Sequence, residues 1–481
     1  MNTKLYFLIA WIFILIGIAI RFYFQFISWT FNGDEINLGI NIIEKSFREL
    51  LLPLERGQSA PPLFLLLMKF FSLFGKPELT LKILTFITSS LTLPLFYKII
   101  KRKKEKIYLL ALGLLCFSPF VITNSLTLKQ YSFDLFFIVL GFIIINYKRS
   151  SYTLIIFSIL FCLCSNIGPF FCLSSIILIL NQANFSRFNR FHLRSILFLA
   201  VGPIVYFIYF IYFINQEGAD ELRAFMQDYW EEAFAPLNLD FIKWYLIRVK
   251  GLGFYFFTSY LLIDIFLLLI SFIGIVANLI EKNKNEIIHK ILKNYLIIIS
   301  IHLVLSSLKL YPFSDRLYLY LAPFLYISLT KGILTCLNIF NSSLLKKKIK
   351  LKYRFHYISF ILLIIMIYQI PYKDNDVKNT ISEIRKYNDD IYITQKSKAS
   401  ISLWFELTKD RNVQEILEKS NILDIEVLPE KNAVILSRQQ LKFGHQKETS
   451  LPEIEIQFLL SEKKIKLVQT FIGYKLYIFK P

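Results

Sequence analysis

Long apolar segments separated by short polar connectors occupy most of the first 371 residues. They lie near 5–27, 79–100, 107–124, 129–146, 152–165, 168–182, 194–215, 256–280, 292–309, 317–340 and 354–371. A helix needs about 20 mainly apolar residues to cross a bilayer, so the pattern predicts a polytopic α-helical membrane protein with about 11 transmembrane helices. The region 152–182 fits either one kinked helix or two short ones.

The pattern changes after residue 371, where the apolar runs shorten to the length of strands. The runs are "DIYIT", "ILDIEVL", "AVILS", "IEIQFLL" and "YKLYIF", and "KASISLWFELTK" and "RNVQEILEK" between them have the spacing of helices. Residues 372–481 are therefore predicted to form a small soluble α/β domain, separate from a membrane domain at 1–371.

The first polar connector, residues 28–78, contains further predicted helices. Apolar residues recur every three or four positions at Ile36, Ile40, Ile43, Phe47 and Leu50. That spacing predicts a juxtamembrane helix that lies along the membrane surface. A polar turn and a Pro-Pro pair then precede a second apolar helix in "ERGQSAPPLFLLLMKFFSLFG", where proline suits the first turn.

Composition excludes an ordinary soluble protein. Hydrophobic residues make up 55% of the chain, charged residues only 19%, and the mean hydropathy is +0.51. The net charge of +20 would favour nucleic acid as a partner, but the basic clusters occupy short connectors between apolar runs. This distribution instead predicts a cytoplasmic N-terminus and an extracytoplasmic C-terminal domain, with no nucleic-acid partner.

Several types of site have no motif in the chain. The five cysteines fall within apolar runs, and none has the spacing of a zinc site. There is no Walker loop and no GxGxxG motif after a strand, so the sequence predicts no nucleotide site. No His and acid pattern at metal-ligand spacing occurs either.

Two adjacent acids, Asp34 and Glu35, follow the first apolar run in "NGDEINLG". A carboxylate at a membrane boundary has access to water and could act as a general base toward an acceptor hydroxyl. The alternative is structural, because acids favour helix N-termini and Asp34 could cap the following helix.

A second candidate group stands in "SLTLKQYSFD", where Lys129, Gln130 and Tyr131 begin the fourth predicted span. Asp134, one turn deeper, could pair with a cation or line a cavity. The alternative for Lys129 and Tyr131 is interfacial anchoring, with the lysine extended toward water and the tyrosine in the aromatic belt.

The third candidate group is "KLYPFSDRLYLYLAP", which begins at Lys309 and includes Tyr311 and Arg316. The planar guanidinium of Arg316 suits a phosphate. The alternative is a local ion pair with Asp315, which would contribute little at an exposed position.

Two further features have open interpretations. The connector 216–255 is rich in aromatic and basic residues and could cover a site, contact lipid or be an ordinary amphipathic loop. His302 lies inside a predicted span, where a buried neutral histidine with a backbone partner is the commoner arrangement.

Together, these motifs resemble the polytopic GT-C glycosyltransferases, specifically the bacterial branch related to protein O-mannosyltransferases and lipid A aminoarabinose transferase. The resemblance rests on four stretches in order: "NGDEINLG", residues 57–97, "SPFVITNSLTLKQYSFDLF" and "YPFSDRLYLYLAP". It covers nearly the whole chain, including the small C-terminal α/β domain.

The resemblance implies an inverting transfer of a sugar from a polyprenyl-phosphate donor to an acceptor on the outer side of an inner (plasma) membrane. It implies Asp34 as base and Glu35 in support of the site. Lys129 and Arg316 would neutralise the leaving phosphate, with Arg56 and Lys309 as further candidates for it. Gln130, Tyr131 and Tyr311 would contact substrate.

One position departs from the resemblance. Relatives commonly carry Glu two residues before the basic residue of the fourth-span motif, and Thr127 stands there in this chain. The use of a divalent cation varies in the class and stays open. Two other functions also stay open: a transporter or flippase for lipid-linked sugars, which would usually show an internal repeat, and a non-catalytic membrane scaffold.

Overall fold

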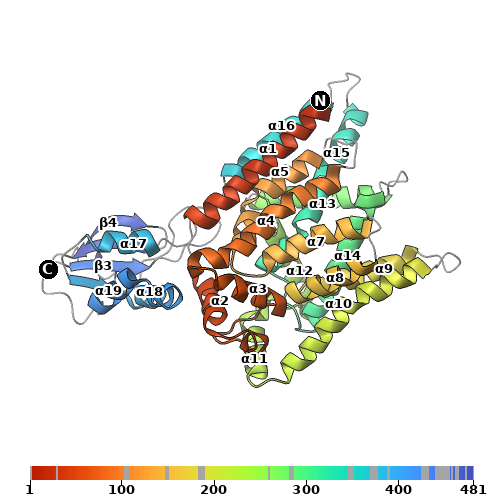
Figure 1. Ribbon diagram of the computed structural model, residues 1–481. Coiled ribbons are helices and arrows are strands. Elements are labelled where there is room, and N and C mark those ends of the chain that lie inside the picture. Colours follow the sequence, from red (N-terminus) through yellow and green to blue (C-terminus); the bar gives the residue numbers. More distant parts are fainter. Residues whose placement is uncertain are drawn as a thin grey trace. The chain divides into compact units, whose positions relative to one another are not determined.

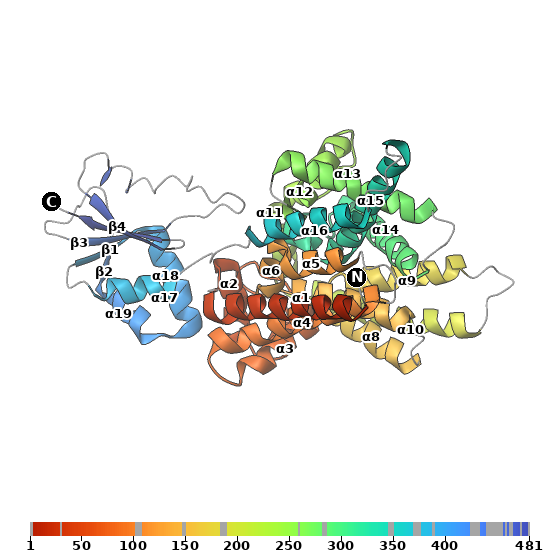
Figure 2. The ribbon, with the colours of Figure 1, turned by 90° about the horizontal axis from the view of Figure 1, so that it is seen from above.

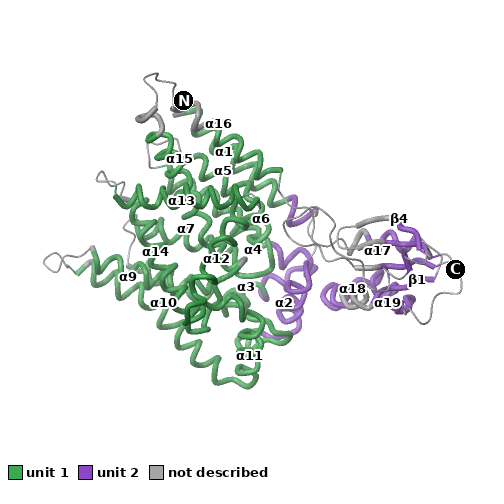
Figure 3. The backbone as a smooth tube through the Cα atoms, turned by 180° about the vertical axis from the view of Figure 1, so that it is seen from behind, with its two compact units in different colours: residues 1–22, 47–68, 83–371 green, residues 23–46, 69–82, 372–481 purple. Residues whose placement is uncertain are grey.

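The computed structural model (Figure 1) describes most of the chain. The described residues are 3–28, 31–101, 108–146, 151–182, 190–257, 260–280, 286–344, 351–368, 377–386, 390–423, 433–438, 456, 459–460, 465–471 and 474–479. They form two compact units, coloured separately in Figure 3. Unit 1 comprises residues 1–22, 47–68 and 83–371, and unit 2 comprises residues 23–46, 69–82 and 372–481.

Unit 1 is built from helices. They are α1 (Thr3–Phe22), η2 (Glu49–Leu51), α5 (Leu109–Phe117), α6 (Pro119–Leu126), α7 (Tyr131–Asn146), α8 (Ser151–Cys164), α9 (Gly168–Gln182), α10 (Arg190–Ile214), α11 (Ala219–Tyr229), η5 (Glu231–Ala233), α12 (Asp240–Phe256), α13 (Leu261–Ile280), α14 (Glu286–Ser307), η6 (Asp315–Leu321), α15 (Ala322–Leu344) and α16 (Leu351–Tyr368). The helices α3 (Pro62–Ser72) and α4 (Pro77–Lys101) contribute residues to both units.

Over the described residues, each apolar run that was expected to cross the membrane is mostly helical. Among the described residues, six helices are long and apolar enough to span a bilayer, or seven if the bent pair α5 and α6 forms one span. The predicted mainly helical fold, with several apolar helices long enough to span a bilayer, is confirmed at this level. The number of spans stays a prediction, because α7, α8, α9 and the described part of α16 are apolar but shorter.

The run 107–124 is broken into α5 and α6, which bend by 53°. Proline lacks the amide hydrogen that a continuous helix needs, so Pro119 starts a new helix instead. Ser118 serves as the N-cap, and its hydroxyl accepts a hydrogen bond from the Val121 amide at 3.4 Å.

Small residues allow close packing in the interior of unit 1. A Cβ atom on Gly274 of α13 would lie 1.9 Å from the Ser328 carbonyl oxygen of α15, so only glycine fits there. Such small residues let helix backbones approach closely where no hydrophobic effect drives association. Elsewhere in unit 1, the helices α8 and α9 both pack along α10 (Figure 2).

A buried arginine joins three helices of unit 1. Arg21, at the end of α1, is 1% exposed. Its guanidinium donates to the Ser89 hydroxyl of α4 at 2.8 Å and to the carbonyls of Leu115 and Cys116 at 3.1 and 3.0 Å. The last two carbonyls belong to the final turn of α5, which has no intrahelical partners for them. Arg21 therefore caps α5 with a side chain from another helix.

Unit 2 contains a five-stranded mixed sheet in the order β2-β1-β3-β5-β4. The central strand β3 (Ala433–Arg438) runs parallel to β1 (Asp390–Ile393), which also pairs in parallel with β2 (Ser420–Ile422). The strand β5 (Tyr474–Phe479) is antiparallel to β3 and to β4 (Ile465–Phe471). The accompanying helices are α17 (Val377–Ile384), α18 (Gln395–Thr408) and α19 (Arg411–Lys419).

The remaining elements of unit 2 are η1 (Tyr23–Ser28) and α2 (Gly33–Glu44). The helix α2 packs against α18, and the buried rings of Phe31 and Trp404 lie 6.4 Å apart. The amphipathic helix expected after Asp34 is therefore present. It ends at Glu44, so Phe47 and Leu50 do not extend its apolar face.

The strand predictions are confirmed only in part. "DIYIT", "AVILS" and "YKLYIF" coincide with β1, β3 and β5, whereas most of "ILDIEVL" lies outside the described residues. The strand predicted for "IEIQFLL" is wrong, because its described residues are helical and place Ile456 and Leu459 in the core of the sheet. Unit 1 ends at residue 371, where the sequence predicted the end of the membrane domain, but unit 2 also contains residues 23–46 and 69–82. The division into two domains at 1–371 and 372–481 stays a prediction.

Candidate functional site

Lys129 is a buried cation in the connection between α6 and α7. The chain turns at Thr127, the C-cap of α6, whose hydroxyl donates to the Asn124 carbonyl at 2.9 Å. The Lys129 amide then donates to the Thr127 carbonyl at 2.7 Å. The Lys129 side chain is 6% exposed, and its ammonium donates to the Gln58 side-chain oxygen at 2.6 Å.

Gln58 belongs to a tight turn that also carries Arg56. Arg56 and Gly57 both have left-handed backbone, with φ of 60° and 61°. Glycine suits position 57, because a Cβ there would be strained by the left-handed backbone and would lie 2.2 Å from a ring carbon of Phe225 in α11. The Gln58 amide group donates back to the Arg56 carbonyl at 3.3 Å. The turn thus fixes Gln58 beside Lys129 and leaves the Arg56 side chain exposed.

Arg316 lies in the first turn of η6, which packs against α6 and α7. The guanidinium carbon is 5.7 Å from the ring centre of Tyr131 and 5.9 Å from that of Trp230. Aromatic faces attract cations at such distances. Since Tyr131 follows Lys129 by two residues, the structure brings the second and third candidate motifs together.

The loop before η6 is fixed from several sides. His302 of α14 is fully buried, and its Nε2 and Nδ1 lie 2.9 Å from the Pro312 carbonyl and the Tyr320 hydroxyl. A carbonyl can only accept, so Nε2 carries the proton and Nδ1 accepts from Tyr320. The Phe313 amide donates to the Ala233 carbonyl at 2.9 Å. These bonds set the position from which Arg316 projects.

Two buried polar atoms in this region have no hydrogen-bond partner among the described residues. They are the Tyr311 hydroxyl and the Gln130 side-chain oxygen. Burial raises the pKa of Tyr311 well above its usual value, and the nearby Asp134 acts in the same direction. The phenol therefore keeps its proton and can donate to a ligand, while the Gln130 oxygen can accept.

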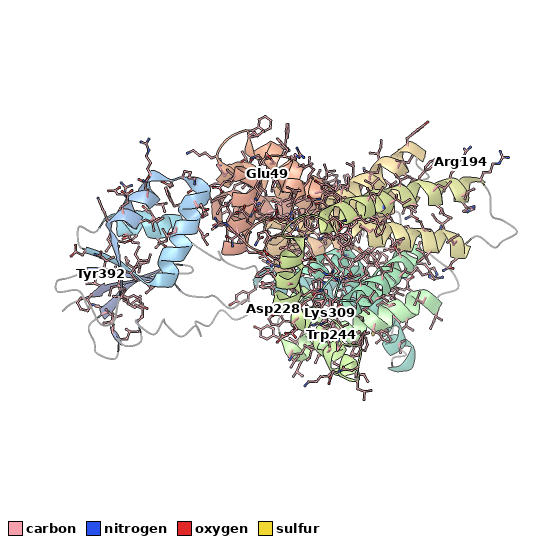
Figure 4. The ribbon with its side chains drawn as sticks, turned by 90° about the horizontal axis from the view of Figure 1, so that it is seen from below. Glu49, Arg194, Asp228, Trp244, Lys309 and Tyr392 are labelled. Atoms are coloured by element: carbon pink, nitrogen blue, oxygen red, sulfur yellow. The ribbon has the colours of Figure 1, made fainter. Side chains whose placement is uncertain are left out.

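Asp134 and Lys309 differ in their surroundings. Asp134 is 2% exposed in α7 and accepts a hydrogen bond from the Ser165 hydroxyl. Lys309 is exposed beyond the end of α14, in the same region of unit 1 as Trp244 (Figure 4). Its backbone is left-handed, with φ of 54°, and its carbonyl accepts a long hydrogen bond of 3.5 Å from Gln227.

The two acids Asp34 and Glu35 belong to unit 2. Asn32 is the N-cap of α2, and its side-chain oxygen accepts from the Glu35 amide at 3.0 Å, while the Glu35 carboxylate accepts from the Asn32 amide at 2.9 Å. This reciprocal pair is a capping box. The expectation that Asp34 caps the helix is therefore wrong: Asn32 and Glu35 do so. Asp34 directly precedes Glu35 in the first turn of α2 and is partly exposed.

Sequence reasoning did not identify Gln58 or Trp230 as parts of this arrangement. It favoured His302 as a buried histidine with a backbone partner, which the bond to the Pro312 carbonyl confirms. A lysine at the start of a membrane span indicates only that some polar acceptor lies nearby. Nothing in the sequence shows that the acceptor of Lys129 is a residue 71 positions away.

In the part of the chain that is described, no group of three or more His, Cys, Asp or Glu residues could hold a metal ion. The use of a divalent cation stays open.

Comparison with known proteins adds little. No protein-family model and no curated protein sequence matches the chain. Among solved structures, it overlaps the crystal structure of ArnT from Cupriavidus metallidurans bound to undecaprenyl phosphate, with 11% sequence identity and a TM-score of 0.44 over 97% of each chain. The overlap spans both chains but is too loose to carry a structural or functional conclusion.

Proposed function

We propose that this protein is a membrane glycosyltransferase that uses a polyprenyl-phosphate sugar as donor. The supporting observation is the buried Lys129 ammonium, held at 2.6 Å by Gln58 in the same unit as Arg316. Burying a cation is costly unless polar or anionic groups surround it. A pair of fixed cations is suited to the negative charge that develops on a departing phosphate.

The proposed reaction breaks the bond between the anomeric carbon and the phosphate oxygen. The acceptor oxygen attacks from the opposite face of the sugar, so the configuration inverts and polyprenyl phosphate leaves. Asp34 takes the acceptor proton, since a carboxylate can serve as general base. Lys129, Arg316 and Arg56 neutralise the phosphate.

The substrate contacts follow from the polar atoms near these cations. The Tyr311 hydroxyl and the Gln130 side-chain oxygen are buried atoms that have no partner among the described residues. They offer one donor and one acceptor to the hydroxyls of a hexose or pentose. Glu35 keeps Asp34 at the start of α2 through the capping box.

A lipid-linked donor fits the chemistry of the chain better than a nucleotide sugar. The sequence has no phosphate-binding glycine-rich motif. Several apolar helices can hold a long isoprenoid tail, while the phosphate stays at the membrane boundary. The basic connectors favour a reaction on the outer side of an inner (plasma) membrane, where lipid, glycan and protein acceptors are all present.

The test is Asp34→Asn in membranes supplied with polyprenyl-phosphate sugars, with transfer to envelope material as readout. Loss of a general base lowers the rate by about 100- to 10 000-fold. The matched control is Asp228→Asn, an exposed aspartate of α11 (Figure 4), which should keep wild-type transfer. Undiminished transfer by a folded Asp34→Asn protein removes Asp34 from the mechanism.

A further inference from the structure

The helix α12 has two opposite faces. One face carries Trp244 and Arg248, which hold the helix to the rest of unit 1 through hydrogen bonds to the Glu232 carbonyl. Arg248 also donates to the Ser314 hydroxyl at 2.9 Å. The other face and the residue before the helix expose apolar and basic side chains; these are Leu239, Ile242, Lys243, Leu246, Ile247 and Lys250. We call this set the α12 lysine face.

The apolar residues of the α12 lysine face are strongly exposed. Leu239, Ile242 and Leu246 are 92%, 66% and 61% exposed. The face lines a shallow hollow of about 520 Å³. An exposed apolar surface of this kind marks an interaction site.

The connectivity of α12 favours lipid as the partner. The helix lies between α10 and α13, and both of these include candidate membrane spans. It is too short and too charged to be one itself, with Asp240, Lys243, Arg248 and Lys250 in 17 residues. A helix with one apolar face and basic residues beside it lies in the plane of the membrane interface.

We infer that the α12 lysine face binds an anionic phospholipid of the surrounding leaflet. An acyl chain lies along Leu239, Ile242 and Leu246, and the headgroup phosphate lies between Lys243 and Lys250. The two lysines are seven residues apart, so their Cα atoms are separated by about 10.5 Å along one side of the helix. This spacing lets both long side chains reach a single phosphate.

Nearby charges leave the two lysines available to the phosphate. Asp240, one turn before Lys243, accepts a hydrogen bond from the Asn238 side chain at 3.0 Å. Arg248 projects from the opposite face and contacts Glu232 and Ser314. The lysines are therefore the cations that the outward face presents, and this binding does not depend on the proposed transfer reaction.

Native mass spectrometry of the purified full chain, titrated with phosphatidylglycerol or phosphatidylcholine, tests the inference. Each basic residue near an anionic headgroup contributes about a fivefold factor in affinity, so Lys243→Gln with Lys250→Gln should weaken the strongest phosphatidylglycerol binding by roughly 25-fold. Phosphatidylcholine binding should not change. The charge-preserving pair Lys243→Arg and Lys250→Arg should bind phosphatidylglycerol like the wild type.

The matched control is Lys409→Gln with Lys466→Gln, which removes two exposed lysines from unit 2 and should leave lipid binding unchanged. Circular dichroism checks that each variant is folded. Equal phosphatidylglycerol binding by the wild type and the Gln variant would overturn the inference. A dimer that the Gln variant dissociates would also overturn it, because the face would then bind a second copy of the chain.

Discussion

The Lys129 ammonium donates a hydrogen bond to the Gln58 side-chain oxygen at 2.6 Å, although 71 positions separate the two residues. Both side chains are buried. The bond joins the turn that carries Arg56 to the start of α7, so it orients the lysine toward its neighbours in unit 1. A hydrogen bond to a charged group contributes about 1.5–3 kcal/mol, enough to hold one rotamer of a flexible lysine.

The role of Lys129 is tested by changing its partner. Gln58→Glu places a carboxylate beside the ammonium and neutralises it, whereas Gln58→Leu only removes the acceptor. If Lys129 binds the donor phosphate, Gln58→Glu should lower kcat/KM for the donor by about 100-fold and Gln58→Leu by about tenfold, following the energies of charged hydrogen bonds. Steady-state kinetics in nanodiscs measures both.

The control for this pair is Gln216→Glu, at a partly exposed position after α10. It adds the same charge to unit 1 and should leave kcat/KM unchanged. Full donor turnover by Gln58→Glu would mean that Lys129 does not contact the phosphate.

The Arg316 guanidinium carbon lies 5.7 Å from the ring centre of Tyr131 and 5.9 Å from that of Trp230. Arg316→Lys keeps the charge but loses the planar donor fork and its stacking. We expect kcat/KM for the donor to fall by about tenfold or more, which corresponds to one charged hydrogen bond. Arg223→Lys, at an exposed position of α11, is the control. A wild-type rate for Arg316→Lys would show that charge alone suffices there.

His302 is expected to act on Arg316 through the loop 311–314. His302→Phe keeps a ring of similar size but loses the bonds to the Pro312 carbonyl and the Tyr320 hydroxyl. Hydrogen exchange of the amides in residues 313–317 should become about tenfold faster, since one lost hydrogen bond changes local opening by about 1 kcal/mol or more. Tyr320→Phe removes only the Nδ1 partner and should have a smaller effect. Unchanged exchange in His302→Phe would contradict this role.

The sequence predicted individual elements better than it predicted their partners. Apolar length identified the helices, and the spacing after Asp34 identified α2, because burial imposes a period on each element. The sequence also contained a signal for the cap of α2, because Asn32 and Glu35 are three residues apart, which is the spacing of a capping box. A pairing such as that of Lys129 with Gln58 produces no repeating pattern in the sequence, since the two residues come from separate segments.

Errors in the predictions had local physical causes. The run 107–124 gave no sign of a break in its apolar length, but Pro119 ends the hydrogen-bond ladder of α5 and bends the chain by 53°. That α5 and α6 together form one span stays a prediction. "IEIQFLL" was expected to be a strand because short apolar runs do not distinguish strand from buried helix. The charged and aromatic residues of the candidate site were predicted from the sequence. The sequence contained no signal that Gln58 would contact Lys129 or that Trp230 would lie beside Arg316.

Arg21 provides a test of the fold that is independent of any reaction. Its guanidinium satisfies the Gly17, Leu115 and Cys116 carbonyls and the Ser89 hydroxyl inside unit 1. Arg21→Leu would leave the last carbonyls of α5 without this donor in an apolar interior, where each unsatisfied group costs about 1–3 kcal/mol. The free energy of unfolding, measured by titration with SDS in mixed micelles, should fall by about 3 kcal/mol. Arg194→Leu, at an exposed position of α10 (Figure 4), should leave it unchanged. A stability of Arg21→Leu equal to that of the wild type would mean that water or a rearranged side chain can replace this cap.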